Sequence, residues 1–106
     1  MRTTGNKVAI VTGASRGIGA AIASRLAADG LTVIVNYAGS ADAAAKVVDG
    51  IARAGGQAIS AQADVSDARA VGRMFDAAEA TYGAVDVLVN NAGIMGAAQN
   101  VFPNVR

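Results

Sequence analysis

Short apolar runs rich in β-branched residues alternate along this chain with longer stretches in which apolar residues recur every three or four positions. The short runs are VAIV (8–11), LTVIVNY (31–37), QAISAQA (57–63) and VDVLV (85–89), and each is typical of a strand. The stretches between them are typical of helices, because that spacing places side chains on one helical face. The pattern therefore predicts the order β-α-β-α-β-α-β.

The three predicted helices have recognisable ends. Ser40 can cap the start of the second helix, and Ser66 or Asp67 can cap the start of the third. Glycines lie where the helices should end, at Gly30, Gly55, Gly56 and Gly83. The apolar stripes are Ile18, Ile22 and Leu26 on the first helix, Ala44, Val47, Val48 and Ile51 on the second, and Val71, Met74, Phe75, Ala78 and Tyr82 on the third.

Strict alternation of helices with nearly continuous apolar strands indicates an α/β fold. Its parallel sheet should be doubly wound, with helices on both faces and right-handed crossovers. We expect residues 1–93 to form this unit and residues 94–106, where the periodicity is lost, to form an irregular tail. Ligands of such sheets bind at the carboxyl ends of the strands. The loops expected there are 12–19, 36–40, 64–67 and 90–93.

The composition narrows the chemistry available. The chain has 106 residues, of which 53% are hydrophobic and 16% charged, as in a soluble globular domain. With no cysteine and no histidine it cannot supply a thiol nucleophile, a Ser-His pair or a Cys/His zinc site. A net charge of +1 without a basic cluster argues against a nucleic-acid partner. No early apolar segment is long enough for a signal or a membrane span, so we expect a cytoplasmic protein.

The loop TGASRGIG, from Thr12 to Gly19, follows the first predicted strand directly. Gly13, Gly17 and Gly19 form a G-x-x-x-G-x-G pattern, which is neither G-x-G-x-x-G nor a P-loop. Glycines before a helix N-terminus allow a phosphate to approach free backbone N–H groups and the positive end of the helix dipole. The alternative is a tight turn with close packing, but the position within a β-α-β unit favours phosphate binding.

The end of the second predicted strand bears on which dinucleotide would bind. Asp or Glu at this point holds a free ribose 2′-OH, whereas here the chain has Asn36, Tyr37 and Ala38. The missing carboxylate favours NADP over NAD, since a carboxylate would repel a 2′-phosphate. Arg16 could pair with that phosphate and Ser40 could donate to it. Alternatively Arg16 is only solvated and Ser40 only a cap.

The two remaining loops also leave alternatives open. Asp64, followed by Val65, could accept from an adenine amino group, but its spacing fits a turn into the next helix better. The segment NNAG (90–93) offers two amides that could satisfy strand-end backbone groups or contact a ligand. Structural bracing is at least as good an interpretation for Asn90 as ligand contact.

Together, TGASRGIG, the DV pair at 64–65 and NNAG resemble the short-chain dehydrogenase/reductase superfamily, in its large classical group, over residues 7 to about 95. ASRGIG and VNYAGS are similar to bacterial NADP-dependent members such as 3-oxoacyl-acyl-carrier-protein reductases. The resemblance implies a Rossmann-type doubly wound sheet, here incomplete, with about four strands in the order 3-2-1-4. The implied cofactor contacts are Thr12, Gly13, Ser15, Arg16, Gly17, Ile18 and Gly19 at the phosphates, Asn36, Tyr37, Ala38 and Ser40 at the 2′-phosphate, Asp64 and Val65 at the adenine, and Asn91, Ala92 and Gly93 at the ribose and nicotinamide.

The resemblance also implies a reaction, hydride transfer between the nicotinamide and a carbonyl or alcohol substrate. The family uses a Ser and a Tyr-x-x-x-Lys motif for it, but Tyr37 precedes Ala41 and Tyr82 precedes Asp86 at that spacing. We therefore expect the cofactor-binding part of a reductase without catalysis of its own. The alternatives are a free-standing NADP-binding module and a remnant whose glycines only pack. Uncovered apolar sheet surface should favour self-association.

Overall fold

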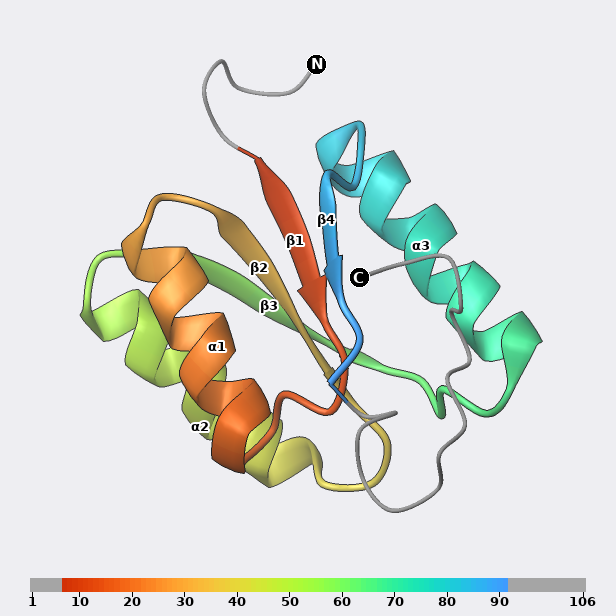
Figure 1. Cartoon of the computed structure of the whole chain (residues 1–106), viewed down its shortest axis with the longest axis horizontal. Coiled ribbons are helices and arrows are strands. Elements are labelled where there is room, and N and C mark those ends of the chain that lie inside the picture. Colours follow the sequence, from red (N-terminus) through yellow and green to blue (C-terminus); the bar gives the residue numbers. More distant parts are fainter. Residues whose placement is uncertain (1–6, 92–106) are drawn as a thin grey trace.

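The structure is a computed structural model that describes residues 7–91, and in this part of the chain four strands alternate with three helices (Figure 1). The predicted order of elements is confirmed. The elements are β1 (Val8–Val11), α1 (Gly17–Ala28), β2 (Thr32–Tyr37), α2 (Ala41–Arg53), β3 (Gln57–Gln62), α3 (Ala68–Tyr82) and β4 (Val87–Val89). The tail expected at 94–106 lies outside the described residues.

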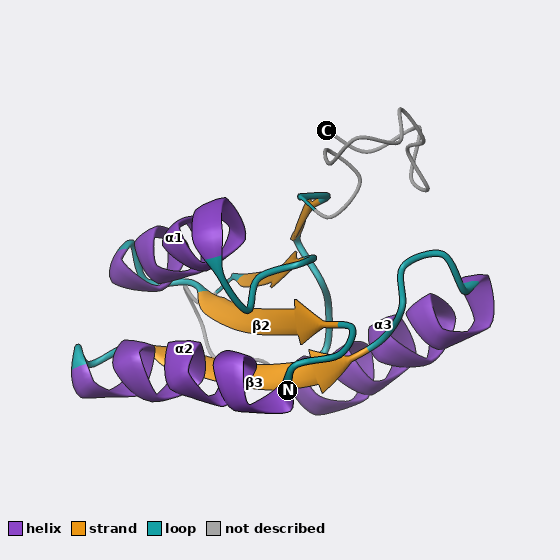
Figure 2. Ribbon diagram, turned by 90° about the horizontal axis from the view of Figure 1, so that it is seen from below, coloured by secondary structure: helices purple, strands orange, loops and turns teal. Residues whose placement is uncertain are grey.

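All strand pairs in the sheet are parallel, in the order β3-β2-β1-β4, which confirms the predicted order 3-2-1-4. Figure 2 shows β2 and β3 running side by side in the same direction. Thr32 of β2 pairs with Val8 on one side and Gln57 on the other, and Ala9 pairs with Val87. Because every strand points the same way, the four loops predicted to carry function begin at one edge of the sheet.

Helices cover both faces of this sheet, as the apolar strands predicted. In Figure 1, α1 and α2 lie on one side of the strands and α3 on the other. Successive residues of β2 serve the two cores in turn: Val33 and Val35 pack with α1 and α2, and Ile34 packs with Met74 and Ala78 of α3. The alternation explains why the strand is apolar on consecutive positions.

Helix α1 packs on the sheet through its smallest residues. Gly19, Ala23 and Ala27 are buried, whereas Ile18, the first residue of the predicted apolar stripe, is 70% exposed. Ile22 and Leu26 are partly buried against the same core. Small side chains let the helix backbone approach the strands closely. The predicted stripe of larger residues is therefore not the face of α1 that lies directly against the sheet.

The helix ends match the expected caps. The Ser40 Oγ accepts a hydrogen bond from the Ala43 N–H at 3.3 Å, and Asp67, one of the two candidates, caps α3. Gly30 and Gly83 have φ of +99° and +91°, a backbone conformation that residues with a β-carbon rarely adopt. Within residues 7–91 there is no helix with the length and apolar content that a membrane crossing requires.

Candidate functional site

The glycine loop makes a tight turn from β1 into α1, and its three glycines have two structural reasons. Gly13 and Gly17 have φ of +59° and +61°. Gly19 has an ordinary backbone, but a β-carbon there would overlap the Gly13 carbonyl oxygen and the Asn91 amide nitrogen. The turn and the close helix packing that formed the alternative interpretation are both present, and they place the start of α1 at the carboxyl edge of the sheet.

The backbone N–H groups in the first turn of α1 have no capping side chain. Arg16 is the N-cap in extended conformation, and no side chain makes a capping hydrogen bond. The first turn contains no acidic residue, and a β-carbon at Gly17 would meet nothing within 4 Å. The uncapped N–H groups and the positive end of the helix dipole therefore face a surface that an anion can reach.

Around this open turn the predicted phosphate contacts are accessible to different degrees. Arg16, Gly17 and Ile18 are exposed, and Ser15 is half-buried. Arg16 has no carboxylate partner in the described part of the chain, where the ion pairs are Arg25 with Asp29 and Arg53 with Asp49. Its guanidinium is therefore available to an anionic ligand.

Asn36 lies under the glycine loop and joins three strand ends. Its Oδ1 accepts from the Gly13 N–H at 3.1 Å, and its Nδ2 donates to the carbonyls of Ala63 at 3.1 Å and Ala61 at 3.3 Å. Its backbone carbonyl accepts from the Ala14 N–H at 2.8 Å. The residue is only 1% exposed, and these bonds hold the loop; the contact of Asn36 with a 2′-phosphate stays a prediction.

The end of β4 braces the same loop from the other side. The Asn91 Nδ2 donates to the Gly13 carbonyl at 3.2 Å, and the Thr12 hydroxyl donates to the Asn90 Oδ1 at 3.4 Å. The Thr12 N–H donates to the Val89 carbonyl at 3.0 Å, and Thr12 is fully buried. Thr12 and Asn90 therefore brace the loop, and the phosphate contact expected for Thr12 stays a prediction. Ala92 and Gly93 lie outside the described residues.

The loop between β2 and α2 presents no carboxylate over residues 36–40. Ala38 is exposed, and its carbonyl is held by the Gln62 amide at 2.9 Å. Tyr37 is half-buried against the core of α1 and α2. Ser40 accepts through its oxygen at the start of α2, which leaves its hydroxyl hydrogen able to donate.

Asp64, after β3, forms the turn that its spacing predicted. Its Oδ1 accepts from the Ser66 hydroxyl at 2.7 Å and from the Ser66 N–H at 2.9 Å. These bonds, the hydroxyl first, lower the pKa of the exposed Asp64 carboxyl below its ordinary value. The adjacent Val65 is half-buried. The turn leaves the exposed carboxylate beside the same edge as the glycine loop.

Sequence reasoning missed the inward role of Asn36, although a signal was present. A polar side chain in the continuous apolar run LTVIVNY must either face a ligand or be hydrogen-bonded inside the protein. The position of the residue in the strand could not decide between these, because the partners come from the glycine loop, β3 and α3. Among residues 7–91 no group of acidic residues could hold a metal ion.

The fold and the site define a dinucleotide-binding type of α/β protein, with an open helix N-terminus after β1 and braced loops at the carboxyl edge of a parallel sheet. A family model described as short chain dehydrogenase matches residues 7–104. The chain therefore belongs to the short-chain dehydrogenase family.

Comparison with individual proteins gives relatives among both fungi and bacteria. The chain is 56% identical over 89 residues to elsinochrome reductase 1 of Elsinoe fawcettii, and 52% identical over 89 residues to the 3-oxoacyl-acyl-carrier-protein reductase FabG of Staphylococcus epidermidis. Each match covers 84% of this chain, and 33% and 36% of the two relatives. The chain thus spans about a third of the length of these curated relatives.

Among solved structures, the fold is similar to that of a short chain dehydrogenase from Burkholderia cenocepacia, crystallised in complex with NADP. The TM-score is 0.79 and the identity 54%, over 86% of this chain and 37% of the other. The resemblance to the short-chain dehydrogenase superfamily expected from the sequence is confirmed, and bacterial relatives are joined by fungal ones.

Proposed function

We propose that the carboxyl edge of the sheet binds NADP, with the pyrophosphate on the first turn of α1. The observation that carries this proposal is the uncapped, acid-free start of α1 after a glycine turn. Gly13, Ser15, Gly17, Ile18 and Gly19 surround or shape that turn, and a solved relative is a complex with NADP. Thr12 contributes by holding the loop to β4 through the Val89 carbonyl.

The preference for NADP over NAD is the second part of the proposal. The exposed guanidinium of Arg16 and the hydroxyl of Ser40 supply donors for a 2′-phosphate, and residues 36–40 supply no carboxylate to repel it. In this proposal Tyr37 and Ala38 lie beside the 2′-phosphate, while Asn36 supports the glycine loop through its bond with the Gly13 N–H. In the same proposal Asp64 and Val65 flank the adenine, and Asn91, Ala92 and Gly93 flank the ribose and nicotinamide.

A fluorescence titration with NADPH and NADH tests both parts. We expect NADPH to bind more tightly by about 1–3 kcal/mol, the range of a charge-assisted contact, and Arg16→Ala to lose most of that difference. Arg25→Ala is the matched control, because Arg25 lies on the same helix and pairs with Asp29. Equal affinity for the two nucleotides, or an unchanged NADPH affinity in Arg16→Ala, would contradict the preference.

We further infer that the reaction of the whole protein is hydride transfer between the nicotinamide and a carbonyl or alcohol. The family and the reductase names of two relatives support it. Neither tyrosine of the 106 residues has a lysine four positions later, so this chain is expected to hold the cofactor without turnover. Carbonyl-dependent NADPH oxidation by a preparation whose intact mass matches the chain would overturn that expectation.

The competing function is a non-binding domain whose glycines serve packing alone. Gly19 has a packing reason, and Gly13 and Gly17 have a backbone reason in their positive φ. The open space around Gly17, however, is not explained by packing and leaves the turn accessible. No detectable binding of NADPH or NADH by a chain with native-like circular dichroism would favour this second function.

A further inference from the structure

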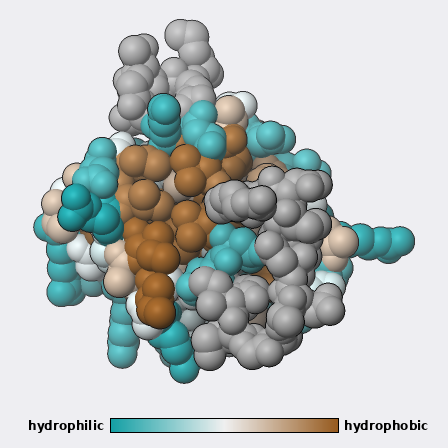
Figure 3. All heavy atoms as spheres, viewed as in Figure 1, coloured by the Kyte–Doolittle hydropathy of each residue, from teal (hydrophilic) through white to brown (hydrophobic). Residues whose placement is uncertain are grey.

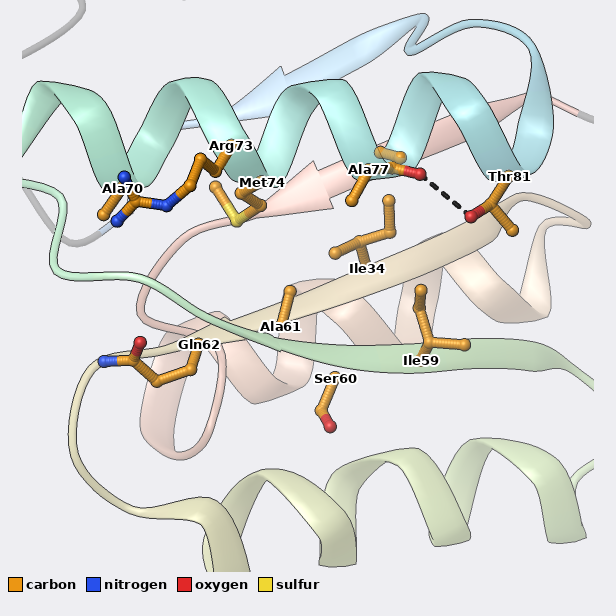
Figure 4. A pocket seen from close by; sticks show the side chains of 11 residues that line it. Ile34, Ile59, Ser60, Ala61, Gln62, Ala70, Arg73, Met74, Ala77 and Thr81 are labelled. Carbon is orange, nitrogen blue, oxygen red and sulfur yellow. Dashed lines mark hydrogen bonds between the residues drawn. The ribbon is translucent and has the colours of Figure 1, made fainter.

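We propose that the groove between α3 and β3 binds a medium-chain amphiphile through an anionic carboxylate head. The groove has a volume of about 310 Å³, at the lower end of the range for small-molecule pockets. None of the residues that line it is assigned to the cofactor. Figure 4 shows the groove with the helix on one side and the sheet on the other.

The floor and the wall of the groove are apolar. Ile59 and Ala61 rise from β3 toward α3, while the intervening Ser60 points away (Figure 4). Ala77 and Thr81 form the far part of the wall. The Thr81 hydroxyl donates to the Ala77 carbonyl at 2.9 Å, so the groove receives no free hydroxyl hydrogen from it.

Ile59 makes this surface unusual within the described part of the chain. It is 39% exposed, although it is a large apolar residue on a strand, and β3 carries no charged residue over Gln57–Gln62. Edge strands are normally protected by charged residues or proline. An apolar ligand lying over Ile59 would remove this exposed surface from water.

The other end of the groove is polar and positively charged. Figure 4 places the Arg73 guanidinium at the end opposite Ile59 and Thr81. The Gln62 side chain also lies at this end, but its Nε2 donates to the Ala38 carbonyl, so Arg73 is the group considered for an anion. Neither Arg73 nor Arg69, one helical turn away on α3, is paired with a carboxylate within residues 7–91. Like charges at this spacing repel, and a bound anion would relieve the repulsion.

The groove is thus amphipathic along its length, and this decides the class of occupant. A guanidinium fork matches a carboxylate in geometry and charge, and the apolar end matches an alkyl chain. A neutral alkyl molecule would leave Arg73 unpaired, and a cationic one would be repelled. The proposal does not depend on whether the carboxyl edge binds NADP.

Methyl NMR of the isotope-labelled chain, titrated with sodium octanoate below its micellar concentration, tests the site. We expect shifts at Ile59, Ala61, Met74 and Ala77. Octan-1-ol should bind about tenfold more weakly and octylammonium should not bind, because only the carboxylate meets Arg73 with complementary charge. Equal binding of octanoate and octan-1-ol would overturn the proposal, as would shifts confined to the isoleucines of α1.

Two variants test the carboxylate head and the alkyl part of the ligand separately. Arg73→Gln should weaken octanoate about tenfold, to the level of octan-1-ol, while Arg53→Gln on α2 should leave it unchanged. Ala77→Leu should fill the groove and abolish binding of both ligands. Ala80→Leu is its matched control, an exposed position on α3 outside the groove. Unchanged octanoate affinity in Arg73→Gln, or Ile59 shifts that follow protein concentration without ligand, would refute the proposal, the latter by showing a second copy of the chain in the groove.

Discussion

Replacement of Asn36 by aspartate should destabilise this fold far more than its near-identical shape suggests. The carboxylate can still accept from the Gly13 N–H, but the donor to the Ala61 and Ala63 carbonyls is replaced by a second oxygen. The buried Ala63 carbonyl loses its donor, and the new carboxylate oxygen that faces it has no donor either. Each buried polar group left without a partner costs about 1–3 kcal/mol, so these two give about 2–6 kcal/mol at neutral pH. That is a large share of the 5–15 kcal/mol typical of a domain.

The loss in Asn36→Asp should depend on pH in a defined direction. Burial and two facing carbonyls raise the pKa of the introduced carboxyl above its unfolded value of about 3.9. The folded state then prefers the protonated acid, whose O–H can donate again to a carbonyl. Relative to the wild-type chain, stability is therefore best preserved below the unfolded pKa and is lost as pH rises through the folded one.

Urea unfolding followed by circular dichroism, from pH 4 to pH 8, measures this difference. Gln62→Glu is the matched control, since it makes the same amide-to-acid change at an exposed position with one hydrogen bond, to the Ala38 carbonyl. We expect Gln62→Glu to change the free energy of unfolding by less than about 1 kcal/mol. The reasoning fails if Asn36→Asp is no worse than this control, or if its deficit does not shrink toward low pH.

Three further outcomes follow from the structure. Gly19→Ala should destabilise the chain and weaken NADPH binding, because the new β-carbon would overlap the Gly13 carbonyl oxygen. The control Gly72→Ala, on the open face of α3, should be neutral or stabilising by up to about 1 kcal/mol. Urea unfolding of both variants measures the difference. The carboxyl of Asp64 should titrate below its ordinary pKa, and its pKa should rise toward that value in Ser66→Ala. Because the folded pKa is lowered, the small contribution of this carboxyl to stability is present above the unfolded pKa and is lost as pH falls through the folded one. An NMR titration showing no change of the Asp64 pKa in Ser66→Ala would contradict this. The chain should self-associate through the apolar patch that Figure 3 shows over α1 and the neighbouring strands, and Ile18→Ser should reduce the sedimentation-velocity dimer fraction; an unaltered fraction would place the contact elsewhere.

The order of elements and the strand order could be predicted because they depend on local periodicity and on general rules of parallel sheets. Ser40 and Asp67 were identifiable as caps because a cap bonds only to residues two or three positions away. The loops at the carboxyl edge were identifiable for the same reason, since parallel strands bring their ends together. The packing face of α1 was harder to predict, because Gly19, Ala23 and Ala27 are small and only weakly hydrophobic.

The sequence by itself thus determined the fold class, the loops at the candidate site and the family, because these follow from spacing along the chain. Only the tertiary structure showed which side chains hold that edge together. Asn36 and Asn91 both reach Gly13, across 23 and 78 positions of sequence. Hydrogen bonds over such separations exist only after the strands have paired, so local spacing along the chain cannot predict them.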